Sequence, residues 1–374
     1  MKRLFLLAAL ACVTMSPAVA ADPELLNISL PDGDTTTGRL CLPEGEAKTV
    51  VVYIHGTGPG SYLNKRKFND TEFNYFDYFA REYNKRGVAF FSYNRRGVEL
   101  GTQPPTYDSV DSARYARYLP LTEAGDVEAM VARLKKDDRL RNAKVLLQGH
   151  SEGTMTATLV ADRRKVPVDG LLLGGYVNEN LYDVIRWQFS GAPAMINLNK
   201  FFDKDKDGVI SRAEYESDEK TPKYVREQTL GGAAFDRMNT IKDSVLNADD
   251  FAMISAPFCE ALMEKTAAGD GAWIWENYVR ITPQWLKAHY ALEPNKSRML
   301  RLDIPVFIFH GTVDASVPVE GVHDIEARFR ACGKTNLKTY LFEGADHDLN
   351  FLDWISSGTV SEGLVKIFDT AAGF

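Results

Sequence analysis

Residues 144–153 read Lys-Val-Leu-Leu-Gln-Gly-His-Ser-Glu-Gly, and residues 154–161 continue Thr-Met-Thr-Ala-Thr-Leu-Val-Ala. The first five residues predict a short buried strand and the last eight a helix, so a Gly-x-Ser-x-Gly motif lies on a strand–turn–helix unit. A serine on such a sharp turn needs small residues two positions before and after it, and the helix points its N-terminus at the serine. We therefore predict that Ser151 is a nucleophile.

Strands and helices alternate over most of the chain. Several predicted strands are continuous apolar runs, which is typical of parallel strands buried on both faces. The segment 121–136 predicts a helix because Val127, Met130, Val131 and Leu134 recur at helical spacing. The alternation predicts an α/β fold with a mostly parallel sheet and helices on both faces. Strands are expected at 26–30, 39–42, 49–54, 88–93, 144–148, 168–174, 304–309 and 339–342, and a closing helix from residue 360.

The alternation stops between residues 177 and 301. This segment is helical and irregular in pattern, and it holds four of the five tryptophans. We interpret it as an inserted, mainly helical lid. Residues 21–176 and 302–374 are then the first and second parts of one core domain.

Five blocks of sequence resemble the α/β-hydrolase superfamily, in its esterase and serine-peptidase-like branch. They are the His55-Gly56 loop, Tyr-Asn-Arg-Arg-Gly-Val at 93–98, the Ser151 turn, and the loops that hold Asp314 and His347. The blocks span both ends of the chain and leave out the lid. Thr154 departs from relatives with this turn, which often have a third glycine there, and this affects helix packing rather than activity. The resemblance implies an α/β-hydrolase fold.

Asp314 and His347 complete a candidate catalytic triad by their positions. In this superfamily the chain order is nucleophile, acid, histidine. Asp314 is the only carboxylate in the loop 310–314, and His347 follows the last predicted strand. The acid would hold the imidazole in the correct tautomer, and the histidine would take the proton of Ser151. His310 ends its strand and is expected to be a buried, hydrogen-bonded scaffold residue.

The loop after the strand 49–54 predicts the second half of an oxyanion hole. It reads His-Gly-Thr-Gly-Pro-Gly at 55–60. In α/β-hydrolases one donor is the backbone N–H of a residue in this loop, and the other is that of the residue after the nucleophile. We assign these donors to Thr57 and Glu152. The alternative is a plain glycine turn.

Residues 203–214 match an EF-hand calcium loop at every diagnostic position, with Gly208 at the sharp turn. The alternative is a solvated acidic loop. The sequence shows no second loop of this kind, so we expect a structural Ca²⁺ site in the lid, and no cofactor for the chemistry. The expected ligands are Asp203, Asp205, Asp207, the carbonyl of Val209, Ser211 (through water) and Glu214.

Three functions follow from these residues. The first is hydrolysis of a carboxylic ester through an acyl-enzyme intermediate. The second is a serine peptidase of the aminopeptidase kind with the same triad, and the sequence does not separate the two because fold does not set substrate. The third is a non-catalytic, calcium-organised binding protein. The partner is expected to be a small ester or a short peptide; the lid aromatics fit either a bulky apolar or aryl group or the packing of the lid itself.

The N-terminus resembles a secretory signal peptide at residues 1–20. Lys2 and Arg3 precede an apolar run, and Ala18-Val19-Ala20 supplies a small-x-small cleavage site. The alternatives are an uncleaved anchor and a lipoprotein modified at Cys12. We expect export to the periplasm or medium, with no stable membrane insertion. The net charge of −7 argues against nucleic acid as a partner, and the sequence leaves the oligomeric state open.

Overall fold

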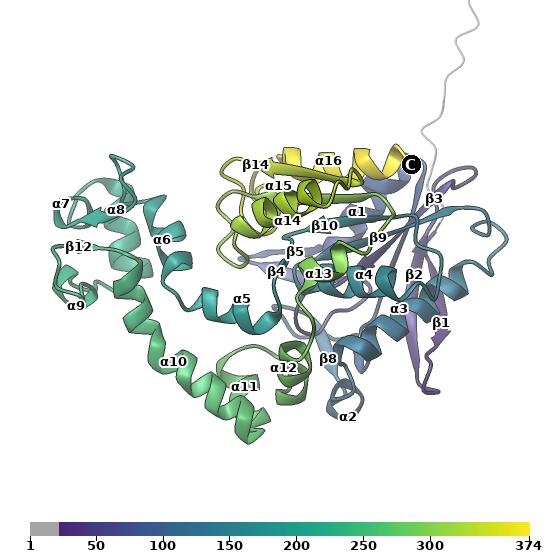
Figure 1. Ribbon diagram of the computed structural model, residues 1–374, viewed down its shortest axis with the longest axis horizontal. Helices are drawn as coiled ribbons and strands as arrows, with labels where there is room; N and C mark the ends of the chain where they lie inside the picture. The colour runs from purple at the N-terminus through teal and green to yellow at the C-terminus, as the bar shows by residue number, and fades with distance from the viewer. Residues whose placement is uncertain (1–21) are drawn as a thin grey trace, which may run out of the picture.

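A computed structural model describes residues 22–374, so the predicted signal peptide lies outside the described residues. The centre is an eight-stranded sheet in the order β1-β2-β6-β3-β9-β10-β13-β14 (Figure 1). From β6 to β14 the strands run parallel, whereas β2 is antiparallel to β6 and β1 to β2. In this order they span Glu24–Ser29, Thr35–Cys41, Val88–Tyr93, Thr49–Ile54, Lys144–His150, Gly170–Gly174, Val306–Gly311 and Leu337–Phe342.

The predicted fold class is confirmed. Each of the eight strands expected from the sequence is present, with ends that differ by a few residues. The central strands β3 and β6 are buried along their whole length, as the continuous apolar runs indicated.

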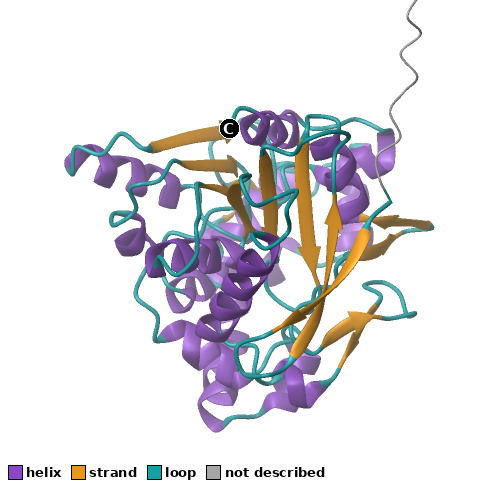
Figure 2. Ribbon diagram, turned by 90° about the vertical axis from the view of Figure 1, so that its right-hand side faces the viewer, coloured by secondary structure: helices purple, strands orange, loops and turns teal. Residues whose placement is uncertain are grey.

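Helices cover both faces of the sheet (Figure 2). Successive side chains of a strand point to opposite faces, and β3 shows the result. Val50, Val52 and Ile54 belong to the core that includes α3, α4 and α14, whereas Val51 and Tyr53 pack with α1 and α16. These helices span Pro120–Leu134 (α3), Glu152–Arg163 (α4), Glu320–Ala331 (α14), Tyr75–Asn84 (α1) and Glu362–Ala372 (α16).

Several short elements lie outside this frame. Two hairpins and two short helices decorate the core near the ends of the parallel strands, and none of them was expected from the sequence. They are β4 (Lys65–Phe68) with β5 (Thr71–Asn74), β7 (Val98–Leu100) with β8 (Asp108–Val110), α2 (Ser112–Tyr115) and α15 (Phe351–Ser357).

The segment between β10 and β13 is mainly helical. Figure 1 shows α6 to α9 away from the sheet, with α5 and α10 leading back toward the core. The helices are α5 (Leu181–Gln188), α6 (Ala192–Asn199), α7 (Arg212–Tyr215), α8 (Lys220–Tyr224), the π-helix η1 (Val225–Thr229), α9 (Phe235–Met238), α10 (Ala248–Ala268), α11 (Gly271–Asn277), α12 (Pro283–Tyr290) and α13 (Asn295–Met299). A two-stranded ribbon joins β11 (Ile210–Ser211) to β12 (Val245–Leu246).

The last helix of this segment, α13, packs with the core. Asn295 donates a hydrogen bond from Nδ2 to the carbonyl oxygen of Val177 at 2.8 Å, and Met299 is buried in the same cluster as α3 and α4. The part of the insertion that stands away from the core therefore ends before Asn295.

Within residues 22–374, no helix has the length and apolar character needed to cross a membrane. The three cysteines of this range, Cys41, Cys259 and Cys332, form no disulfide.

Candidate active site

Ser151 lies on a strained turn between β9 and α4. Its backbone has φ 55° and ψ −125°, a conformation that is rare for a residue with a side chain. A Cβ atom on Gly149 would come within 2.3 Å of the carbonyl oxygen of Gly153, and one on Gly153 within 2.4 Å of that of Ile54. Only glycine fits at both positions, which explains the spacing of the motif.

His347 and Asp314 are joined directly. Nδ1 of His347 donates a hydrogen bond to Oδ2 of Asp314 at 2.7 Å. Burial disfavours the protonated ring, but the hydrogen bond and the charge of Asp314 raise the pKa of His347 above its ordinary value. Burial also opposes the ionised form of Asp314, but His347 lowers the pKa of this carboxyl below its ordinary value. The pair can therefore hold a histidine tautomer with Nε2 free to accept a proton.

His310 lies behind the same carboxylate and is buried, as the sequence indicated. Its Nδ1 accepts a hydrogen bond from the backbone N–H of Tyr176 at 3.1 Å, and its Nε2 lies 3.3 Å from the carbonyl oxygen of Val317 and 3.4 Å from Oδ2 of Asp314. The backbone N–H groups of Ser316 and Val317 donate to Oδ1 of Asp314 at 2.8 and 2.9 Å. Both carboxylate oxygens are thus fixed.

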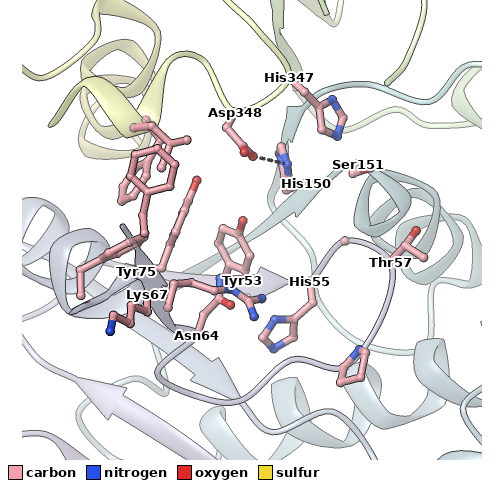
Figure 3. A pocket seen from close by; sticks show the side chains of 17 residues that line it. Tyr53, His55, Thr57, Asn64, Lys67, Tyr75, His150, Ser151, His347 and Asp348 are labelled. Carbon is pink, nitrogen blue, oxygen red and sulfur yellow. Dashed lines mark ion pairs between the residues drawn. The ribbon is translucent and has the colours of Figure 1, made fainter. Parts of the chain in front are cut away.

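Ser151 and His347 line the same two cavities. Among the described residues no direct hydrogen bond joins the two side chains. The larger cavity, of about 450 Å³, is shown in Figure 3 with Ser151, His150 and His347 at one end. Its wall is aromatic and basic and includes Tyr53, Phe73, Tyr75, Phe351, Arg66 and Lys67.

The smaller cavity lies between the serine turn and the lid. It has a volume of about 230 Å³ and also contains Thr57 and Glu152 in its lining. Its apolar wall comes mainly from α5 and α12 and the loop before α12, and includes Leu181, Val184, Ile185, Val279, Ile281 and Trp285. Ser151 therefore borders both the apolar cavity and the aromatic, basic cavity.

The two amides assigned to an oxyanion hole lie beside Ser151. Glu152 opens α4, so its N–H is one of those that a helix leaves without an intrahelical acceptor. Within residues 22–374 neither this N–H nor that of Thr57 donates to another protein group. Both residues line the smaller cavity.

Arg95, to which the sequence analysis gave no role, holds the loop that carries Thr57. Its guanidinium donates to the carbonyl oxygens of Gly56 at 2.7 Å and His55 at 3.1 Å, and also to that of Gly58. The side chain is 1% exposed and lies over the ring of Tyr118 at 4.1 Å. These bonds fix the backbone of the loop 55–58 next to the serine.

Glu152 is a second functional residue whose side chain the sequence did not explain. Its carboxylate is buried and accepts a hydrogen bond from the hydroxyl of Tyr118 at 3.0 Å, with Nη2 of Arg95 at 3.4 Å. Nε2 of His289, on α12 of the lid, lies 3.2 Å from Oε1. Burial would raise the pKa of Glu152, but His289, Arg95 and Tyr118 together lower it. The side chain of Glu152 therefore connects the lid to Arg95, which holds the loop that carries Thr57.

His150 forms a further pair at the mouth of the larger cavity. Its Nε2 lies 3.0 Å from Oδ1 of Asp348, the ion pair marked in Figure 3, and its ring centroid is 4.7 Å from that of His347. Burial opposes ionisation of Asp348, but His150 lowers the pKa of Asp348 to about 2. Nothing in the sequence pairs these residues, because they are brought together only by the meeting of β9 with the loop after β14.

Part of the predicted calcium loop converges in the lid. Carboxylate oxygens of Asp203, Asp205 and Glu214 lie within 4.8 Å of one another, whereas Asp207 is outside this group. Gly208 has φ 89° and donates its N–H to Oδ2 of Asp203 at 3.1 Å. Ser211 uses its hydroxyl to donate to Glu214 at 2.7 Å, and the carbonyl of Val209 precedes the ribbon strand β11. This places the loop far from Ser151, at the end of the lid that Figure 1 shows away from the sheet.

The geometry agrees with the comparison of the sequence with protein-family models. The alpha/beta hydrolase fold family matches residues 49–353. The chain belongs to this family. No curated protein matches the chain.

The solved structures that resemble the chain are distant from it in sequence. An esterase from Exiguobacterium antarcticum is 14% identical over 93% of this chain and 99% of its own, with a TM-score of 0.47. A thermostable carboxyl esterase from Bacillus coagulans is 16% identical over 94% and 99%, with a TM-score of 0.47. An acylaminoacyl peptidase from Pyrococcus horikoshii is 12% identical over 94% of this chain but 41% of its own, with a TM-score of 0.47. At this similarity they carry no argument about substrate.

Proposed function

We propose that this α/β-hydrolase cleaves carboxylic esters through a covalent acyl-enzyme. The observation that carries the proposal is the strained Ser151 turn, which shares a cavity with His347, the partner of Asp314 in a hydrogen bond. A strained serine turn beside a hydrogen-bonded histidine and acid is the arrangement that activates a nucleophile.

The chemistry follows from the atoms in place. Oγ of Ser151 attacks the carbonyl carbon while Nε2 of His347 takes the hydroxyl proton, and Asp314 stabilises the imidazolium. The negative charge on the former carbonyl oxygen is held by the N–H groups of Thr57 and Glu152. His347 then gives its proton to the leaving alcohol. Water attacks the acyl-enzyme, His347 again moves the proton, and the acid is released with Ser151 restored.

The two cavities favour a substrate with two unlike halves. The apolar pocket under the lid accepts a small aliphatic or aryl group, while the larger pocket offers aromatic walls with Arg66 and Lys67. A short peptide cleaved by the same residues is the second candidate. An aromatic, basic pocket of about 450 Å³ is large enough for an amino-acid side chain and a charged end.

The test is labelling with a fluorophosphonate probe, followed by parallel assays on aryl esters and aminoacyl anilides. We expect the wild-type protein to be labelled and Ser151→Ala not to be. Ser109→Ala, at an exposed serine, is the control. Faster turnover of esters supports an esterase, and faster turnover of anilides a peptidase. An unlabelled wild-type protein would instead support a non-catalytic binding protein.

We further propose that residues 203–214 hold a Ca²⁺ ion in the lid. Oδ1 of Asp203 supports this, because it is shielded from solvent and accepts no hydrogen bond from the described residues. A carboxylate oxygen in that state is costly without a cation. Asp205 and Glu214 bring further oxygens to it, and calcium prefers an all-oxygen shell. Export, as the N-terminal sequence predicts, would expose the loop to extracellular calcium, which keeps even a weak site occupied.

A further inference from the structure

The calcium loop has a partner strand that the sequence did not reveal. In the β11–β12 ribbon, Ile210 pairs with Leu246 and Ser211 with Val245. Ile210 is the eighth residue of the loop 203–214. If Leu246 is counted as the eighth residue of a second loop, that loop runs from Asn239 to Asp250. The sequence pattern shows no calcium loop at these positions.

The backbones of the two loops match at their two unusual positions. At position 4, Lys206 has φ 61° and Lys242 has φ 67°. At position 6, Gly208 has φ 89° and Ser244 has φ 76°. Positive φ is uncommon for residues other than glycine, so its repetition at the same two positions is a specific likeness.

The exits of the two loops also match. The position-9 side chains, Ser211 and Asn247, each cap a following helix, α7 and α10. The position-12 carboxylates in turn accept a hydrogen bond from the backbone N–H of the position-9 residue. Oε2 of Glu214 accepts the N–H of Ser211 at 2.8 Å, and Oδ2 of Asp250 accepts that of Asn247 at 3.1 Å. Both loops therefore begin a helix with the same capping box.

One apolar core joins the helices around the two loops. Phe202 and Tyr215 flank the first loop and stack at 5.2 Å, and Tyr215 meets Phe235, before the second loop, at 6.0 Å. Ile210 and Leu246 are fully buried in the same cluster. This cluster is separate from the cores that flank the central sheet.

The second loop lacks the chemistry to bind a cation. Ile241 occupies position 3, where the first loop has Asp205. Asp250 is fully buried, and its Oδ1 accepts the N–H of Ile241 at 2.9 Å and the hydroxyl of Thr240 at 3.2 Å. Oδ1 of Asn239 accepts the N–H of Lys242 at 2.7 Å. Hydrogen bonds within the loop thus satisfy the oxygens that a cation would otherwise contact.

We infer that residues 203–214 and 239–250 form an asymmetric pair of EF-hand loops in which only the first binds Ca²⁺. The inference rests on the calcium site proposed above. The second loop is a cation-free partner that couples the first loop to α10. This 21-residue helix packs on α11 and α12. On α12, Trp285 lines the smaller cavity together with Ser151, and His289 contacts Glu152. Calcium binding is thereby connected to the wall of the smaller cavity.

Calorimetry of the full mature chain with CaCl₂ tests the asymmetry. We expect one Ca²⁺ per chain, and none in Asp203→Ala. Two ions per chain would overturn the asymmetry. If the wild-type protein binds no Ca²⁺, both the proposed calcium site and the asymmetry of the two loops are wrong. The pairing of the loops does not depend on calcium and is tested by the next measurement.

A double-mutant cycle in EDTA tests the pairing without calcium. Ile210→Ala and Leu246→Ala should each lower the melting temperature. The double mutant should lose less than the sum of the two single decreases, because both substitutions remove the same contact. Ile210→Ala with Val131→Ala, which is buried in the core of the central sheet, should be additive. Additivity in the first pair would overturn the pairing.

Hydrogen exchange tests the coupling. On addition of calcium, amide exchange in residues 245–250 should slow together with that in 203–214, although residues 239–250 bind no ion. The change should be absent in Asp203→Ala. Protection confined to 203–214 would overturn the coupling to α10.

Discussion

Oε1 of Glu152 lies 3.2 Å from Nε2 of His289, although one residue follows the candidate nucleophile and the other belongs to the lid. Both side chains are almost fully buried, at 1% and 0% exposure. This polar contact joins α4, the helix that begins at the serine, to α12, the lid helix that lines the smaller cavity. Without this contact the carboxylate of Glu152 would keep Tyr118 and Arg95 as neighbours but lose its link to the lid.

Replacing His289 by alanine should therefore destabilise the fold and loosen the lid. It leaves the buried carboxylate of Glu152 with fewer partners, at a cost of about 1–3 kcal/mol in the free energy of unfolding. KM should rise, because Trp285 on the same helix lines the apolar cavity. Denaturant unfolding and steady-state kinetics measure both effects. His323→Ala, at a histidine side chain that is 59% exposed, is the control; equal stability of the two variants would contradict the role of the contact.

Asp314→Asn should lower kcat by roughly 10⁴-fold, because the amide favours the wrong tautomer of His347. KM should change little, since Asp314 is buried behind the histidine and does not line either cavity. Aryl-ester hydrolysis gives both constants. Asp324→Asn, at a surface ion pair with Arg328, should keep wild-type activity. Near wild-type kcat in Asp314→Asn would place the acid elsewhere.

The pH dependence of activity follows from His347. The ring must be neutral to take the serine proton, and Asp314 raises its pKa above the ordinary value of 6.5. kcat/KM should therefore increase with pH, with a midpoint above 6.5. In Asp314→Asn the midpoint of the residual activity should move to lower pH, because the stabilising charge is gone. A wild-type midpoint below 6.5 would mean that this pair does not control the rate.

Arg95→Gln should lower kcat by about 10²–10³-fold, the cost of a displaced oxyanion donor. The shorter side chain cannot bond the carbonyl oxygens of His55, Gly56 and Gly58 together, so the loop that carries Thr57 loses its fixed position. Arg96→Gln is the matched control: Arg96 is equally buried but pairs with Asp126 at 2.6 Å, away from the loop. Both variants should lose stability, and only Arg95→Gln should lose kcat. Equal kcat losses would assign the effect to folding alone.

The contrast between these two arginines shows where sequence reasoning ends. The strands could be predicted because burial on both faces leaves an apolar run, as in β3, and the serine turn because sterics demand glycine at two fixed positions. Asp314 and His347 could be proposed from chain order. Nothing in Asn94-Arg95-Arg96-Gly97 says which guanidinium turns toward the loop. That depends on where two partners of Arg95 lie in space: the ring of Tyr118, and Glu123, whose Oε1 is 2.8 Å from Nη2 of Arg95.

The second EF-hand loop was missed for a different reason. The pattern is defined by its ligands, and Ile241 and Ser244 replace a carboxylate and the glycine that the pattern requires. What remains is a backbone shape held by Asp250 and by the pairing with Ile210. Such a shape appears only when both segments are placed together.

Calcium should raise the melting temperature of the mature protein, and EDTA should lower it. A ligand that binds only the folded state, at about 100 times its Kd, stabilises that state by about 2.7 kcal/mol. Magnesium should restore less of the loss, because it demands a smaller octahedral shell and keeps its waters. Asp203→Ala with Glu214→Gln should melt like the chelated protein and show no response to calcium. Asp243→Asn, at the fifth position of the second loop, should keep the full calcium-dependent increment. An unchanged wild-type midpoint between EDTA and millimolar calcium would leave residues 203–214 as a solvated acidic loop.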